Sequence, residues 1–208
     1  MEFEPIVRIY ESKLLRRSPL VTALTQISFE QEYEMISQAA KLKGNETLLD
    51  LACGTGIYSR GLAGQLTHGM VLGMDLSAPM LKYANQHMRW EGLENILFIH
   101  GDAIDLPFSG ATFEAVNCCG ALHLFTDLDR VLREISRVLK AGGCFTFATF
   151  RQREGALAER IVRLRQNVTG MNAFRPDELE LRLNHTGFAE VKPHHAKGIW
   201  LVMSAIKQ

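Results

Sequence analysis

The stretch that most constrains the fold of this chain is an apolar run, Leu48–Cys53, followed by the loop Gly54-Thr55-Gly56. A short, continuously apolar run is typical of a strand that is buried on both faces. Glycines directly after it allow a sharp turn and a close approach of the main chain to a ligand. Residues 57–63 have the apolar spacing of a helix, whose free N–H groups favour a negatively charged ligand group. This order indicates a nucleotide site, although a glycine turn is also an ordinary way to end a strand.

Acidic residues follow the next two apolar runs as well. Asp75 follows the run Met70–Met74, and Asp102 follows the run Ile96–His100 after one glycine. The carboxyl ends of parallel strands meet at one sheet edge, where a carboxylate can accept hydrogen bonds from both hydroxyls of a ribose. Asp105 is a competing acid near Asp102, and we expect it to be solvated. The repeated pattern favours a ligand site over a plain turn.

Composition and charge argue against several classes of protein. With 208 residues, 47% of them apolar, the chain suits a single α/β domain over 1–208. Lys and Arg (23) balance Asp and Glu (23), so we expect no nucleic-acid partner. No apolar stretch approaches about 20 residues and the start lacks a secretory signal pattern, so we expect no membrane span and a cytoplasmic location. The cysteines lack paired CxxC spacing, which predicts buried thiols and no metal site.

The remaining patterns predict alternating strands and helices. Residues 1–44 are expected to form an N-terminal helical arm, in which Ser28 and Gln31 make a capping box. Segments 188–194 and 199–206 are separated by four residues, too few for a parallel crossover, and predict a hairpin. The predicted fold is α/β: a Rossmann-like, seven-stranded, mostly parallel sheet with an antiparallel C-terminal strand and helices on both faces. The other strands are expected at 48–53, 70–74, 96–100, 112–119 and 144–150.

Four ordered motifs carry a resemblance to a known family. They are LLDLACGTG, GMDLSAPML, GDAIDLPF and FEAVNCCGALHLFTDLDRVLREISRVLKAGG. Over about residues 28–206 the chain resembles a class I S-adenosylmethionine-dependent methyltransferase, of the small-molecule branch that includes ubiquinone- and menaquinone-biosynthesis-like enzymes. The resemblance implies S-adenosylmethionine as cofactor, a small-molecule methyl acceptor as partner, and a lid from residues 1–44 with a helical insertion at 151–187. A sulfonium donor is already activated, so positioning is expected to supply most of the rate without a metal.

The resemblance assigns five positions to the methionine end of the cofactor. The backbone of the glycine loop, with Ala52, Gly54 and Gly56, would lie against the methionine part. Asp50 would help to hold the amino group, and the backbone carbonyl of Cys118 would receive that group. Many members of the family have glycine where Ala52 stands, so the chain departs slightly from the family pattern there.

Five more positions are assigned to the nucleoside end. Asp75 would bind both ribose hydroxyls, and Leu76 and Met80 would flank the adenine. The carboxylate of Asp102 would accept a hydrogen bond from the exocyclic amine of the adenine, and the backbone N–H of Ala103 would bond a ring nitrogen. The ribose assignment agrees with the position of Asp75 at the end of its strand.

Other side chains near the expected site have two interpretations each. His123, just beyond the fourth strand, could be a general base toward an oxygen or nitrogen nucleophile, or a loop residue that caps the next helix. Tyr58 could pack in the core or contact the cofactor, and Tyr10 could close over the cofactor from the arm. His194 and His195 are expected at the surface of the hairpin.

Two other functions stay open on the sequence alone. An NAD(P)-dependent oxidoreductase would use the same Asp75, but Ser59 stands where that fingerprint needs Gly or Ala, and the hairpin fits it poorly. A non-catalytic methyltransferase-fold subunit would bind the cofactor or a partner chain without turnover. This alternative stays open because the acids indicate that the chain can bind the cofactor, not that it catalyses a reaction. The sequence indicates neither the identity of the acceptor nor the oligomeric state.

Overall fold

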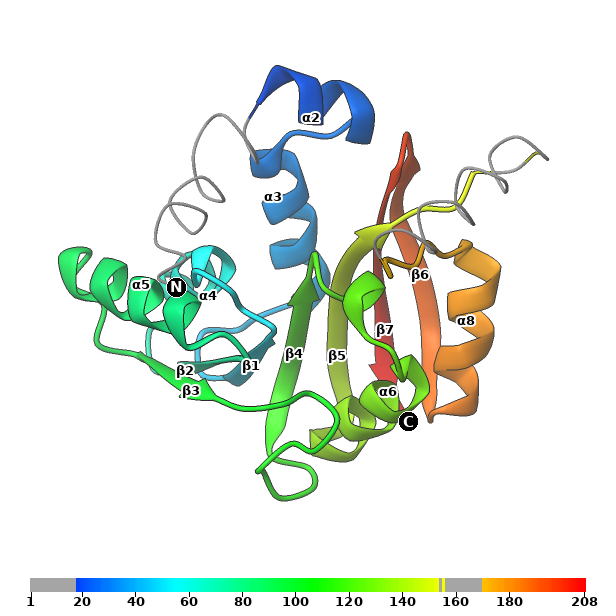
Figure 1. Ribbon diagram of the computed structural model, residues 1–208. Helices are drawn as coiled ribbons and strands as arrows, with labels where there is room; N and C mark the ends of the chain where they lie inside the picture. Colours follow the sequence, from blue (N-terminus) through cyan, green and yellow to red (C-terminus); the bar gives the residue numbers. More distant parts are fainter. Residues whose placement is uncertain (1–17, 154, 156–169) are drawn as a thin grey trace.

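The computed structural model describes residues 18–153, 155 and 170–208, and it is built around a seven-stranded sheet of order β3-β2-β1-β4-β5-β7-β6. Neighbours from β3 to β5 pair in parallel, β7 is antiparallel to β5, and β6 is antiparallel to β7 (Figure 1). This arrangement confirms the predicted fold class, including the antiparallel hairpin. The strands are β1 (Thr47–Leu51), β2 (Met70–Asp75), β3 (Ile96–His100), β4 (Phe113–Cys119), β5 (Leu139–Phe150), β6 (Phe188–Lys197) and β7 (Trp200–Lys207).

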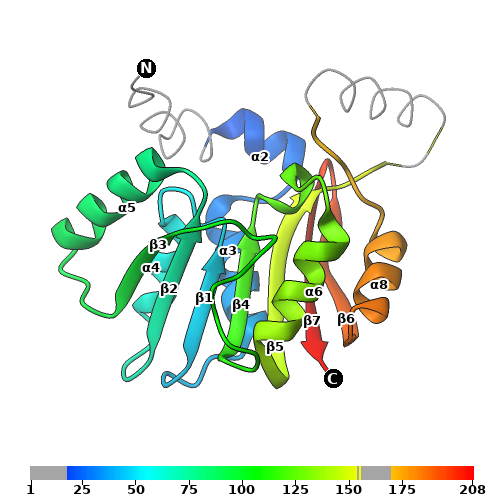
Figure 2. The same cartoon turned by 60° about the horizontal axis from the view of Figure 1, so that its bottom comes forward.

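Helices cover both faces of this sheet (Figure 2). One apolar layer joins the sheet to α3 (Phe29–Ala40), α4 (Ile57–Ala63) and α5 (Ala78–Trp90). The opposite layer joins it to α6 (Leu128–Val138) and α8 (Pro176–His185). The short helix α2 (Pro19–Thr25) precedes α3, and the 3-10 turn η1 (Leu122–Leu124) follows β4. Both faces of the central strands are therefore buried, which explains their continuous apolar runs.

Local signals set the helix starts. Ser28 Oγ accepts a hydrogen bond from Gln31 N at 3.2 Å, and the Gln31 side chain accepts from Ser28 N at 3.0 Å, so the predicted capping box is present. Ser77 and Asp127 cap α5 and α6 in the same way through their side-chain oxygens. The arm predicted for residues 1–44 thus includes α3, which packs against β5 and β7 as part of the covering layer.

Two strand boundaries differ from the prediction by three residues or more, and the others by at most two residues. Strand β5 begins at Leu139 and not at Cys144, because Leu139 already has an extended backbone and pairs with Phe113. The register shifts before Cys144 pairs with Ala115, and this irregularity lets Gly142 and Gly143 lie within the strand. Strand β6 runs on to Lys197, so the hairpin link is shorter than expected.

The prediction that His195 lies at the surface is wrong. Its side chain is buried, and its Nε2 lies 2.8 Å from the carbonyl oxygen of Thr25 at the end of α2. The cause is the position of α2 over the hairpin, where the N–H of Ile199 also donates to the carbonyl of Leu24. His194 is only half-buried, with Nε2 2.8 Å from Ser204 Oγ, and burial lowers its pKa.

Part of the chain cannot be compared with the sequence-based expectations. Tyr10, and residues 154 and 156–169 of the helical insertion expected at 151–187, lie outside the described residues. Within the described ranges, none of the helices combines the length and the apolar content needed to span a bilayer.

Candidate cofactor and acceptor site

The loop after β1 brings main chain to the carboxyl edge of the sheet. Gly54 and Gly56 have φ angles of +56° and +74°, which glycine adopts without steric cost. A Cβ added to Gly56 would come within 2.7 Å of the Phe98 ring, so this position needs glycine for space as well. A Cβ added to Gly54 would meet no atom within 4 Å. The backbone of Gly54 therefore borders open space in which a ligand can lie against it.

Asp75, at the end of β2, holds this loop and the start of α5 together. Its Oδ2 accepts a hydrogen bond from Gly54 N at 2.7 Å, and its Oδ1 accepts from Ser77 N at 2.8 Å. A carboxylate offers about four lone-pair sites, so both oxygens retain capacity for two hydroxyl donors. The side chain is half-buried. Asp75 can thus bind a ribose and keep the glycine loop in place at the same time.

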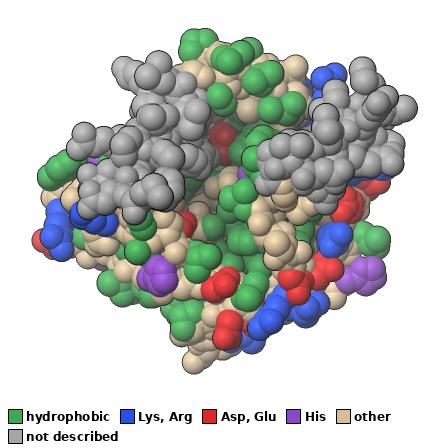
Figure 3. All heavy atoms as spheres, in the orientation of Figure 1, with side chains coloured by type: hydrophobic (Ala, Val, Ile, Leu, Met, Phe, Trp, Pro, Cys, Tyr) green, Lys and Arg blue, Asp and Glu red, His purple; other side chains and the backbone are tan. Residues whose placement is uncertain are grey.

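A cavity of about 340 Å³ lies at this edge of the sheet. Five of the predicted cofactor residues line it: Ala52, Asp75, Leu76, Asp102 and Ala103. A volume of this size is that of a small-molecule site. In Figure 3 the surface is hollowed below α2, and acidic and apolar side chains lie side by side around the centre of that face. The rest of the cavity wall is formed by Leu51, Met74, Gly101, Ile104, Ala121, Leu124, Phe125 and Thr126.

The ends of three strands therefore bring together predicted residues from both ends of the cofactor. Ala52 follows β1, Asp75 ends β2, and Asp102 and Ala103 follow β3. Asp102 is exposed, and its Oδ1 accepts a hydrogen bond from Ile104 N at 3.2 Å. Leu76 is 65% exposed, so it presents an apolar surface to the opening on which a flat ring can pack.

Asp50 lies behind the loop and does not line the cavity. Its carboxylate is buried and accepts hydrogen bonds from Ser59 Oγ at 2.5 Å and from Asn117 Nδ2 at 2.7 Å. Burial raises the pKa of Asp50 from 3.8 to about 6, although these two hydrogen bonds oppose the rise. Asn117 Oδ1 in turn accepts from Thr146 Oγ1 at 3.1 Å. The network ties β1 to α4, β4 and β5 directly below the glycine loop.

The other predicted residues do not line the cavity. Gly54 and Gly56 form the loop beside it, and Met80 lies in the first turn of α5. Cys118 is fully buried near the end of β4. Asp105 is exposed, as expected.

His123 lies in η1, one residue before Leu124 of the cavity wall, and its ring is buried. The Nδ1 atom is 3.3 Å from Thr149 Oγ1, and the ring centroid is 4.3 Å from that of Phe150. His123 thus stands beside the cavity at the end of β5, with its ring held by side chains of that strand. Its carbonyl oxygen accepts a hydrogen bond from Asn172 N at 2.9 Å.

Sequence reasoning missed a buried acid next to this site. Glu32 of α3 accepts hydrogen bonds from Tyr58 Oη and, at 3.0 Å, from Trp200 Nε1. Tyr58 packs on Phe29 and Tyr33, which supports the interpretation of Tyr58 as a core residue. The sequence did contain a signal for Glu32. It lies one helical turn before Ile36, so the helix pattern places this acid on the apolar face of α3.

Comparison with known proteins decides the family. A family model described as "Methyltransferase domain" matches residues 48–143. Residues 48–143 thus belong to a class I S-adenosylmethionine-dependent methyltransferase domain. A demethylmenaquinone methyltransferase of Lactococcus lactis is 38% identical over 121 residues, which are 56% of this chain and 48% of that protein. The chain thus spans about half the length of the curated relatives it matches.

Solved structures share the fold of this methyltransferase domain. A SAM-dependent methyltransferase from Aquifex aeolicus has a TM-score of 0.71 and 19% identity, covering 92% of this chain and 94% of that one. The [4+2]-cyclase SpnF has a TM-score of 0.73 and 20% identity, covering 84% of this chain and 80% of that one. The fold is therefore shared with a protein described as a cyclase, and function has to be argued from the site.

Proposed function

We propose that this protein transfers a methyl group from S-adenosylmethionine to a small-molecule acceptor, with S-adenosylhomocysteine as the product. The observation that carries the proposal is the cavity at the carboxyl edge, which collects Ala52, Asp75, Leu76, Asp102 and Ala103 from three successive strand ends. The family match over residues 48–143 supports the choice of cofactor. The similarity to a demethylmenaquinone methyltransferase supports the reaction class but covers only half of that protein.

The residues at the cavity are proposed to bind different parts of the cofactor. Asp75 binds the two ribose hydroxyls while Gly54 N and Ser77 N hold its carboxylate in position. Leu76 covers one side of the adenine, and Asp102 and Ala103 read its edge. The bound cofactor supplies an activated sulfonium methyl group. Positioning therefore accounts for most of the acceleration that the protein has to provide.

The residues next to the cavity on the η1 side are proposed to face the acceptor. Leu124, Phe125 and Thr126 line the cavity there, and His123 lies directly beside them. The imidazole of His123 is proposed to take a proton from the attacking oxygen or nitrogen of the acceptor. The arm 1–44 and the insertion 151–187, apart from α3 and α8, which pack on the sheet, are proposed to form the acceptor lid. The cytoplasm is proposed as the location.

The test is the release of S-adenosylhomocysteine in a panel of small acceptors sorted by nucleophilic atom: phenols, amines, thiols, carboxylates and enolisable carbonyl compounds. The proposal expects product with at least one class, and Asp75→Ala should abolish most of that product. Glu94→Gln, an exposed change that is remote from the cavity, serves as the matched control. Binding of S-adenosylmethionine without product from any class would instead identify a non-catalytic binding subunit.

A further inference from the structure

A buried carboxylate joins three segments that are far apart in the sequence. Glu32 of α3, Tyr58 of α4 and Trp200 of β7 are each less than a tenth exposed. Trp200 Nε1 donates to Glu32 Oε2 at 3.0 Å, and Tyr58 Oη donates to Glu32 Oε1. Burial of a carboxylate is costly unless hydrogen bonds compensate it, and these two donors do so. These hydrogen bonds therefore fix the positions of α3, α4 and β7 relative to one another.

Trp200 packs against Phe150, which in turn packs against His123. The ring centroids of Trp200 and Phe150 are 5.3 Å apart at 83°, and those of Phe150 and His123 are 4.3 Å apart. Trp200 also meets His123 edge-on at 6.3 Å. Since Thr149 Oγ1 lies 3.3 Å from Nδ1, the imidazole is bounded on several sides. Displacement of the Trp200 ring would leave the His123 ring room to turn.

Tyr58 connects the same carboxylate to the cofactor loop. It lies in the first turn of α4, two residues after Gly56. Its neighbour Ser59 donates to Asp50, which lies below the loop. Glu32 is thus hydrogen-bonded through Tyr58 to the helix that follows the cofactor loop. Through Trp200 it is hydrogen-bonded to one of the aromatic rings beside His123.

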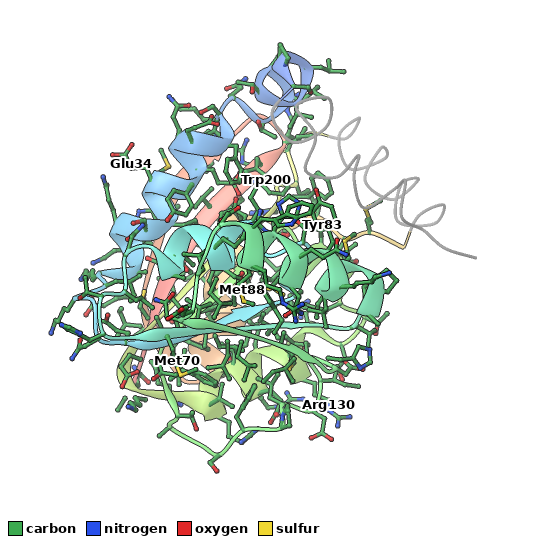
Figure 4. The ribbon with its side chains drawn as sticks, turned by 90° about the vertical axis from the view of Figure 1, so that its left-hand side faces the viewer. Glu34, Met70, Tyr83, Met88, Arg130 and Trp200 are labelled. Carbon is green, nitrogen blue, oxygen red and sulfur yellow. The ribbon has the colours of Figure 1, made fainter. Side chains whose placement is uncertain are left out.

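We propose that Glu32 is a positioning residue for methyl transfer: through Trp200 it sets the orientation of the His123 ring relative to the cofactor loop. The inference rests on the proposed function, in which His123 faces the acceptor. A carboxylate is a poor choice for stability alone, because replacement of buried ionic groups by apolar ones of similar size is often neutral or stabilising. Figure 4 shows Glu34, two residues along α3, on the outer side of the helix, whereas Trp200 lies on its inner side. Glu34 accepts from Gln38 Nε2 at 3.1 Å on the same helix.

The first experiment reads the His123 ring directly by NMR. The carbon-bound imidazole protons of His123 are assigned by comparison with His123→Asn, and their ring-current shifts report the distance to Trp200 and Phe150. Glu32→Ala should move these shifts toward those of exposed histidines, because both hydrogen bonds are lost. Glu32→Gln should leave them in place, since its amide can accept from Trp200 and donate to Tyr58. Glu34→Ala is the matched control. Unchanged shifts in Glu32→Ala, or equal shifts in Glu34→Ala, would overturn the proposal.

The second experiment separates positioning from folding and from cofactor binding. With an acceptor that gives turnover, Glu32→Ala should lower kcat roughly ten- to a hundredfold, the scale of a misplaced reacting group. The Kd for S-adenosylmethionine should stay within about threefold, since Asp75 holds Gly54 through a hydrogen bond that involves neither Tyr58 nor Trp200. If Glu32→Ala does not fold, Trp200→Phe, which keeps a ring but has no N–H to donate, carries the same expectation. Normal kcat in a folded variant would refute positioning. Failure of the wild type to bind S-adenosylmethionine would refute only the proposed function, because the NMR result needs no ligand.

Discussion

Asp50→Asn tests how the polar network below the glycine loop controls stability. Asp50 titrates near 6 in the folded protein and near 3.8 when exposed, because burial disfavours its charged form. At 1.36 kcal/mol per pH unit, this difference amounts to about 3 kcal/mol. The native state binds this proton more tightly than the unfolded chain. The contribution of Asp50 is therefore fully present below 3.8 and is lost as the pH rises through about 6.

The assay is urea unfolding, followed by far-ultraviolet circular dichroism, of the wild type and Asp50→Asn at a series of pH values. Asparagine has nearly the same size but does not titrate. The free energy of unfolding of the wild type minus that of the variant should rise by about 2 kcal/mol as the pH falls from about 7.5 to about 4. Glu134→Gln provides a control of opposite sign, because a hydrogen bond from Arg137 lowers the pKa of Glu134. A pH-independent difference for Asp50 would refute the reasoning.

Three further changes probe the loop and the site. Asp75→Ala should weaken S-adenosylmethionine binding by roughly 1.5–3 kcal/mol, the loss of charged hydrogen bonds, as measured by calorimetry; an unchanged Kd would contradict the ribose assignment. Gly56→Ala should lower the free energy of unfolding more than Gly54→Ala does, because only Gly56 faces Phe98 at 2.7 Å; equal losses in urea unfolding would contradict the packing. His123→Ala should lower kcat by about 10²-fold or more if the imidazole is the general base, and normal turnover would remove it from the mechanism.

Much of the site was predictable because its signals are local. Strand ends and the residues that follow them are adjacent in sequence, so the motif around Gly54 and the acids Asp75 and Asp102 could be placed at one edge before the structure was known. The parallel order of the strands then brings them together. The same holds for Ser28 and Ser77, whose caps involve only the next three residues.

The errors and omissions lie where distant segments meet. His195 lies on an edge strand, where a polar side chain is expected to face solvent. It is buried because α2 lies over it. Glu32 is bonded to Trp200 across 168 residues of chain, a contact that no local pattern encodes. The hydrogen bond from Asn117 to Asp50 likewise joins residues 67 positions apart, so the sequence alone did not indicate it. Burial and long-range partners, rather than residue type, decided these positions.

Isothermal titration of the protein with S-adenosylmethionine and, in parallel, with NAD tests the central claim most directly. The cavity beside Gly54, with Asp75 and Asp102 at its wall, predicts saturable binding of S-adenosylmethionine and no detectable heat with NAD. Asp75→Ala should remove most of the signal. The absence of S-adenosylmethionine binding, or tighter binding of NAD, would contradict the account.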